Sequence, residues 1–123
     1  MRLKETKKRF AAALLFQFRV IVKGDSGKRR LCEKRIINFV ARNGLEALKE
    51  AKLRGRTSQY SYKNNEGNPV YFEFVGVQDL RCLTPMCKPD EVWFDIVQLV
   101  TPMERKTSLI PPDGKLDAIR NRE

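Results

Sequence analysis

Residues 10–22, FAAALLFQFRVIV, decide the fold because every second residue in them is apolar. One parity is apolar throughout: Phe10, Ala12, Leu14, Phe16, Phe18, Val20 and Val22. The other parity admits polar residues such as Gln17 and Arg19. Successive side chains of a strand point to opposite faces, so the pattern predicts a long strand with one fully buried face.

Residues 1–18, MRLKETKKRFAAALLFQF, imitate a signal peptide, with a basic start followed by an apolar run. The imitation fails in detail. Gln17, Phe18 and Arg19 follow Phe16, where a cleavage site would need small residues, and the run is too short to span a bilayer. We therefore expect a cytoplasmic protein with no membrane partner.

Turn residues and a change of period predict the next elements. Residues 23–30, KGDSGKRR, are typical of a hairpin loop, and a second strand is expected over about 31–41. Asn43 suits an N-cap, and the apolar residues after it recur at helical spacing. We expect a helix over about 44–54 with its apolar side on the sheet, ended by Gly55 as a left-handed C-cap.

Residues 60–77, YSYKNNEGNPVYFEFVGV, predict a hairpin of two strands around an NNEGNP turn. In the returning strand, alternation places Val70, Phe72 and Phe74 on one face. The other face receives Tyr71, Glu73, Val75 and Val77. Because this hairpin holds almost no lysine or arginine, we expect it in the interior of the sheet. Gly76 permits a close backbone approach or a bulge.

A last strand is expected over about residues 91–100, followed by an extended tail over 101–123 with room for a short helix near 116–120. The expected order is β-β-α-β-β-β. These elements predict one α+β domain over residues 1–100, with a basic start at 1–9. It is an antiparallel sheet of about five strands with one main helix packed on a face.

Composition restricts the chemistry. The chain of 123 residues contains no histidine and three cysteines. This excludes serine–histidine and cysteine–histidine catalysis, and it leaves a poor ligand set for zinc. The carboxylate pairs lie where a strand approach and a helix surface are expected, and the GDSGK segment lacks the spacing of a phosphate-binding loop. We therefore expect no enzyme activity, no cofactor and no metal, with free thiols in a reducing compartment.

The net charge of +10 is unevenly distributed along the chain. Residues 1–56 carry 17 basic and 5 acidic residues, whereas residues 57–123 carry 8 basic and 10 acidic ones. Such a basic half either faces an anionic partner or forms a solvated surface. RNA is one such partner, but an RNA-binding surface also needs exposed aromatic residues, and most aromatics here are expected in the core.

Four segments resemble a known family. They are AALLF at 12–16, an E-x-R-I strand at 33–36, an E-A-L-x-x-A helix at 46–51, and SYKNNEGNPVYFEFVGVQDL at 61–80. In these segments the chain is similar to the bacterial domain-of-unknown-function family four-two-eight-eight, over about residues 10–100. The resemblance implies a small bacterial protein without established catalytic residues. By analogy with other small bacterial proteins, it also implies an immunity protein that inhibits a cognate toxin.

Two functions therefore remain open at the level of sequence. The leading hypothesis is a toxin inhibitor that covers an acidic active cleft, and the alternative is RNA binding by the basic half. Trp93 lies beside acidic residues on its parity, so it is either an anchor for a protein partner or a cover for the helix or the tail. The candidate partner contacts are Lys28, Arg29, Arg30, Lys52, Arg54, Arg56 and Trp93.

Overall fold

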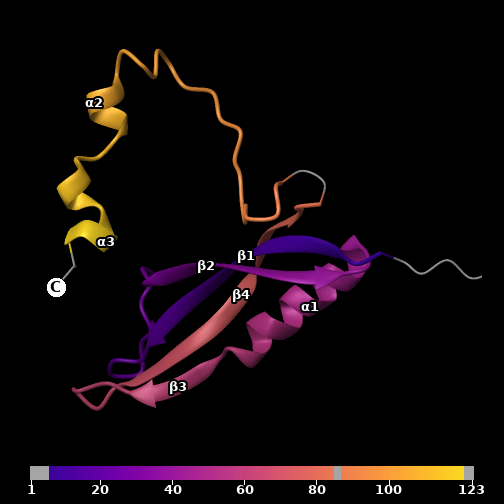
Figure 1. The fold of residues 1–123 in the computed structure, drawn as a ribbon. Helices are drawn as coiled ribbons and strands as arrows, with labels where there is room; N and C mark the ends of the chain where they lie inside the picture. Colours follow the sequence, from indigo (N-terminus) through magenta and orange to yellow (C-terminus); the bar gives the residue numbers. More distant parts are fainter. Residues whose placement is uncertain (1–5, 85–86, 121–123) are drawn as a thin grey trace, which may run out of the picture.

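The computed structural model describes residues 6–84 and 87–120, so parts of the basic start and of the tail lie outside the described residues. Within these ranges four strands form one antiparallel sheet with the order β2-β1-β4-β3, and one long helix packs on it (Figure 1). The elements are β1 (Lys8–Val20), β2 (Cys32–Ala41), α1 (Gly44–Thr57), β3 (Tyr60–Lys63) and β4 (Pro69–Cys82).

The first strand is the centre of the sheet, as its strict alternation predicts. β1 pairs with β2 on one side and with β4 on the other. Phe10, Leu14 and Phe16 are at most 4% exposed and lie in the core. The expected strand is therefore confirmed, and its buried face is confirmed from Phe10 to Phe16. Phe18 and Val20 are only partly buried, the strand ends at Val20, and Val22 is 47% exposed.

Helix α1 covers one face of the sheet because its buried stripe is made of small residues. The Asn43 side chain caps its N-terminus by accepting a hydrogen bond of 2.9 Å from the Glu46 backbone N–H. Ala47 and Ala51 are fully buried in the same cluster as the phenylalanines of β1. We call the face of the sheet under α1 the helix face and the opposite one the open face.

The expected end of this helix is wrong. The helix continues to Thr57, and Ser58 is its C-cap with a right-handed backbone, so Gly55 lies inside the last turns and not after them. The glycine is required there by packing. A Cβ at Gly55 would lie 2.5 Å from ring atoms of Phe74 on β4.

Strand β4 does not keep one parity throughout. Its register against β1 shifts twice, once between Leu15 and Phe16 and once between Ala13 and Leu14. Val75 is 57% exposed, whereas Val77 packs against the core, contrary to the expected pattern. A bulge rotates the following side chains to the other face, so the two shifts correct the parity predicted for Val75 and Val77.

Only one strand of the β3–β4 hairpin lies in the interior of the sheet. β4 lies between β1 and β3, but β3 is an edge strand and all four of its residues are exposed. The turn is held by Asn64, whose Oδ1 accepts 3.0 Å hydrogen bonds from the backbone N–H groups of Glu66 and Asn68. Gly67 has a φ of +78°, as an expected turn glycine should.

The fifth strand expected over residues 91–100 is absent from the described structure, which reduces the sheet to four strands. Residues 93–95 of this segment instead lie against Arg81 of the open face without joining the ladder, and Ile96 after them is 89% exposed. Arg81 donates hydrogen bonds to the Phe94 carbonyl oxygen and, at 2.9 Å, to Asp95. Its guanidinium lies 5.0 Å from the Trp93 ring centroid. Trp93, Phe94 and Asp95 therefore contact Arg81 as three consecutive residues and not with the alternation of a strand.

The C-terminal residues project from the domain (Figure 1). They contain two short helices, α2 (Lys106–Leu109) and α3 (Asp117–Arg120), and a 3₁₀ turn, η1 (Asp113–Lys115). In the part of the chain that the structure describes, these three elements contact no strand of the sheet. The helix α3 lies where the sequence allowed a short helix.

A first prediction concerns Gly55. In Gly55→Ala the new methyl group must displace the Phe74 ring, whose centroid lies 5.5 Å from that of Phe16. We expect a loss of about 1–3 kcal/mol in the free energy of unfolding. Gly44→Ala is the matched control, because Gly44 also belongs to α1 and has no atom within 4 Å of an added Cβ. Equal denaturant midpoints for the two variants would contradict this account.

Candidate functional site

The basic loop between β1 and β2 carries three of the predicted contacts. Lys28, Arg29 and Arg30 are all exposed there. The loop is folded by its own turn residues, because Gly27 N–H donates to Asp25 Oδ1 at 3.0 Å and Arg30 donates to Ser26 Oγ at 3.1 Å. The loop therefore presents Lys28 and Arg29 from a defined backbone.

The helix carries three more of the predicted contacts. Lys52, Arg54 and Arg56 are exposed on α1. Arg54 is engaged within the fold: its Nε donates to Glu50 Oε1 at 2.8 Å, and its guanidinium lies 5.1 Å from the Phe39 ring centroid. Lys52 and Arg56 thus extend the basic surface of the helix more freely than Arg54 does.

Trp93 does not join either group. It is half-buried against Arg81, which pairs with Ala11 near the start of β1. The basic loop follows the end of β1, so Trp93 and the loop lie at opposite ends of this strand. Ala11 and Arg81 belong to the open face, while the helix covers the opposite one. The structure therefore places Trp93 as a cover of the sheet, and the seven predicted residues do not form one surface.

A groove opens where the helix no longer covers the helix face. The 14 residues of α1 span about 21 Å, whereas the 13 residues of β1 span about 43 Å. Beyond the end of α1, side chains and the loop between β1 and β2 cover the strands. The resulting open pocket has a volume of about 430 Å³. Its lining residues are Phe18, Val20, Ser26, Arg29, Arg30, Leu31, Tyr62, Asn64 and Val70.

We call this pocket the tyrosine–arginine groove. Its floor is apolar and its rim is basic and polar. Leu31 is 74% exposed and Tyr62 is 47% exposed, so large apolar groups meet solvent beside Arg29. The lining contains no acidic side chain.

Two exposed tyrosines next to the groove were not predicted as site residues. Tyr60 and Tyr62 stack on each other with ring centroids 6.0 Å apart, and Tyr60 also stacks on Phe72 at 4.8 Å. Placing the hairpin in the interior of the sheet concealed them. The signal lay in the shortness of the strand and in the polar residues Ser61 and Lys63 between and after the tyrosines, which are typical of an edge strand.

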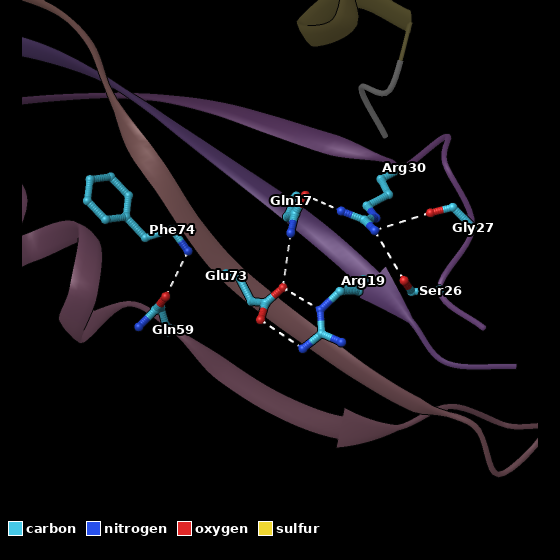
Figure 2. Close-up of polar contacts among 8 residues, drawn as sticks. All are labelled: Gln17, Arg19, Ser26, Gly27, Arg30, Gln59, Glu73 and Phe74. Atoms are coloured by element: carbon cyan, nitrogen blue, oxygen red, sulfur yellow. Dashed lines mark hydrogen bonds and ion pairs between the residues drawn. The ribbon is translucent and has the colours of Figure 1, made fainter. Parts of the chain in front are cut away.

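Arg30 is positioned by a polar network that crosses β4 and β1 (Figure 2). The Arg19 guanidinium makes two hydrogen bonds to the Glu73 carboxylate, of 2.8 and 3.0 Å. Gln17 donates to the same carboxylate at 3.0 Å and accepts from Arg30 at 3.1 Å. The chain of contacts therefore runs from the centre of the sheet to the basic loop.

The network also changes the protonation of its members. The hydrogen bond from Arg19 holds the pKa of Glu73 below its usual value, and Glu73 in turn raises the pKa of Arg19. The carboxylate is thus ionised over a wider range of pH than a free one. Both side chains are about one-third exposed, so solvent weakens the pair.

The side chains that could ligate a metal lie apart from one another in the described residues. These residues contain no group of three or more histidine, cysteine or carboxylate side chains that is placed to hold a metal ion. Cys32, Cys82 and Cys87 are free thiols. No helix among them is long and apolar enough to cross a membrane.

A second prediction concerns Glu73 and pH. Its folded-state pKa is depressed, so its stabilising effect is present above the unfolded-state pKa and is lost as the pH falls through the folded-state value. We expect Glu73→Gln to lower the melting temperature at neutral pH, and this difference to shrink below about pH 4. Glu50→Gln, at an exposed pair on α1, is the control and should have little effect. A difference for Glu73→Gln that is unchanged in acid would argue against the network.

Comparison with known proteins places the chain in a family. A family model described as Domain of unknown function (DUF4288) matches residues 10–92, which include the whole sheet except the start of β1, and also α1 and Arg81. No curated protein and no solved structure matches the chain. The resemblance seen in the four sequence segments is thus confirmed, and the chain belongs to the DUF4288 family.

Proposed function

We propose that this chain is a non-enzymatic protein-binding module that acts in the cytoplasm as an immunity protein. It inhibits a cognate bacterial toxin domain by covering that domain's active cleft. The observation that carries the proposal is the tyrosine–arginine groove, an open apolar hollow with a basic rim on a rigid sheet.

The composition of the groove favours a protein partner. Tyrosine and arginine are the residue types, with tryptophan, that most often dominate the affinity of protein interfaces. Tyr62 and Leu31 supply exposed apolar area, and Arg29 supplies a planar guanidinium that pairs with carboxylates through two parallel hydrogen bonds. A protein side chain that enters the groove would therefore be buried against apolar walls and held at the rim.

The charge of the groove favours an acidic partner. Arg29 and Arg30 line it without an acidic neighbour among the lining residues, and Lys28 precedes them in the loop. Complementary potentials accelerate association and exclude wrong partners. An acidic cleft in the toxin domain fits this surface, whereas a basic cleft would be repelled.

The predicted residues take different roles in this proposal. Lys28 and Arg29 contact the partner directly, and Arg30 reaches it from the network that positions it. An interface of ordinary size buries about 800 Å² of each partner. We expect an interface of this size, centred on the groove, to extend past Tyr60 to the end of α1. Lys52, Arg54 and Arg56 therefore belong to the rim of the interface, and Trp93 lies outside it.

The absence of buried polar groups also supports a binding function. Among the described residues no polar or charged side chain is buried. Catalytic acids, bases and nucleophiles are usually desolvated and strongly perturbed in pKa. Here the resolved pKa changes of Glu73, Arg19 and Glu46 follow from hydrogen bonds within ion pairs on the surface.

The third prediction tests the groove against the partner. The partner is the variable C-terminal domain of a secreted protein encoded next to this chain, co-expressed with it. We expect co-purification and rescue of growth by the native chain. The double variant Arg29→Glu/Tyr62→Ala should weaken the complex by at least about 30-fold, the effect of losing a dominant contact. Lys106→Glu, a charge reversal of equal size on α2, should leave the complex intact.

The outcomes separate the function from the surface. If the two proteins neither co-purify nor restore growth, the immunity function fails. If Arg29→Glu/Tyr62→Ala binds as tightly as the native chain, the inhibitor function stands but the groove is not its contact surface.

A second candidate function is RNA binding, and the exposed tyrosines favour it. The sequence pattern disfavours RNA because it predicts most aromatic residues in the core, but Tyr60 is 52% exposed and Tyr62 is 47% exposed. Stacked aromatic rings beside arginines are the surface on which single-stranded nucleic acids bind without sequence preference. This candidate differs from the first in the partner and uses the same groove.

The fourth prediction applies to this candidate. Filter binding of a single-stranded RNA should give an affinity that falls steeply with salt and that Tyr60→Ala/Tyr62→Ala weakens by about 1–3 kcal/mol for each base stack lost. Tyr71→Ala, which removes an aromatic ring from the open face beneath Arg19, is the control. No retention of RNA at low salt would remove this candidate.

A further inference from the structure

The open face of the sheet is covered around Ala11 and Arg81 by residues 93–95, and beyond them it carries exposed apolar side chains. Ile36 and Val40 on β2 are 50% and 56% exposed, and Val75 on β4 is 57% exposed. Ala13 and Leu15 on β1 pair with Ile36 and Lys34 and lie half-buried on this face. Ile36, Ala13 and Leu15 adjoin Val75 across three strands, whereas Asn38 separates Val40 from them. A grouped apolar patch of this kind on a folded domain marks a contact with another surface.

The C-terminal residues form a second exposed apolar surface. We call residues 96–120 the arm. Its exposed apolar residues are Ile96, Val97, Leu99, Val100, Met103, Leu109, Ile110, Leu116 and Ile119. Around α2 the arm forms an apolar hollow of about 480 Å³, lined by Leu99, Pro102, Met103, Lys106, Leu109 and Ile110. A branched aliphatic side chain fits such a hollow.

The arm begins on the open face. The segment before it is anchored there by Arg81, which binds the Phe94 carbonyl oxygen and Asp95. From Ile96 onward the chain leaves the sheet, and the helices of the arm contact none of the strands (Figure 1). One molecule therefore presents two uncovered apolar surfaces that meet at Asp95.

We propose that two copies of this chain exchange arms, so that the arm of each copy lies on the open face of the other. Such an exchange is two-fold symmetric and buries both apolar surfaces at once. The arm itself carries three acidic and four basic residues, so it brings little of the charge that makes the N-terminal half repel its own copy.

The reach of the arm is sufficient. Residues 96–100 span about 17 Å when extended, about half of the roughly 33 Å of the ten residues of β2, before the turn in which the Arg105 N–H donates to the Thr101 carbonyl oxygen. The chain can thus cross part of the open face of a second copy and place the hollow around α2 against Ile36. The tyrosine–arginine groove lies on the helix face and stays free, so exchange does not depend on the proposed function.

The fifth prediction is measured by light scattering after size exclusion, over a dilution series of the full chain. We expect a mass of twice 14.3 kDa for the native chain at the higher concentrations. Ile36→Lys on the open face and Leu109→Lys/Ile110→Lys on the arm should each give the single mass. Leu53→Lys is the matched control, because Leu53 is as exposed as Ile36, at 50%, but lies on α1. Thermal melts establish that all variants are folded.

Mixing the variants tests the exchange itself. A tagged Ile36→Lys chain keeps its arm, and an untagged Leu109→Lys/Ile110→Lys chain keeps its open face. One arm–face contact is therefore restored, and the two should co-purify although neither self-associates. A native chain that keeps the single mass while its arm resists limited proteolysis would overturn the proposal in favour of packing on its own sheet. A dimer that survives Ile36→Lys would also overturn it.

Discussion

One aromatic stack joins all four strands of this sheet. Phe16 of β1 and Phe72 of β4 lie face to face, with ring centroids 4.7 Å apart and an interplanar angle of 11°, and both are at most 1% exposed. Tyr60 of β3 continues the stack on Phe72, and Arg35 of β2 places its guanidinium 4.8 Å from the Phe16 ring centroid. Because α1 is too short to cover this part of the sheet, the stack is closed by side chains alone.

The groove follows from that constraint. A second helix over the stack would have buried Phe18, Tyr60 and Tyr62, and the surface beside them would be ordinary core. With Arg35 as the lid, itself bound to Glu33 at 2.7 Å, the rings at the end of the stack remain open to solvent. Phe18 packs on Phe72 with ring centroids 4.8 Å apart and also lines the groove, so the stack continues into the apolar floor of the candidate site. The loop between β1 and β2 adds the arginines.

Much of the fold could be predicted from the sequence because its signals are local. Strict alternation indicated β1, the N-cap Asn43 and the small apolar stripe indicated α1, and the NNEGNP turn indicated the β3–β4 hairpin. The failures share a cause, since each depends on a contact between distant residues. The Phe74 ring requires a glycine at position 55 inside the helix, and contact with Arg81 holds residues 93–95 against the sheet without a strand.

The bulges of β4 show the same limit. A period of two in the sequence assigns Val75 and Val77 to one face, but the register is decided by how β4 fits against β1. The candidate site was predictable only in part for this reason. Its charged residues could be predicted from the basic loop. The tyrosines could not, because the sequence does not show that β3 is an edge strand with exposed side chains.

Arg30 connects the two sides of the molecule. It lines the groove at the end of the helix face, yet its guanidinium binds Gln17, whose amide donates to Glu73 on the open face. In the proposed interface, the hydrogen bonds of Arg30 to Gln17, Ser26 and Gly27 would meet part of the cost of ordering this long side chain during folding and not during binding. Arg29 lines the same groove from the neighbouring position in the loop, so the proposed rim combines an arginine held by the fold with an exposed one beside it.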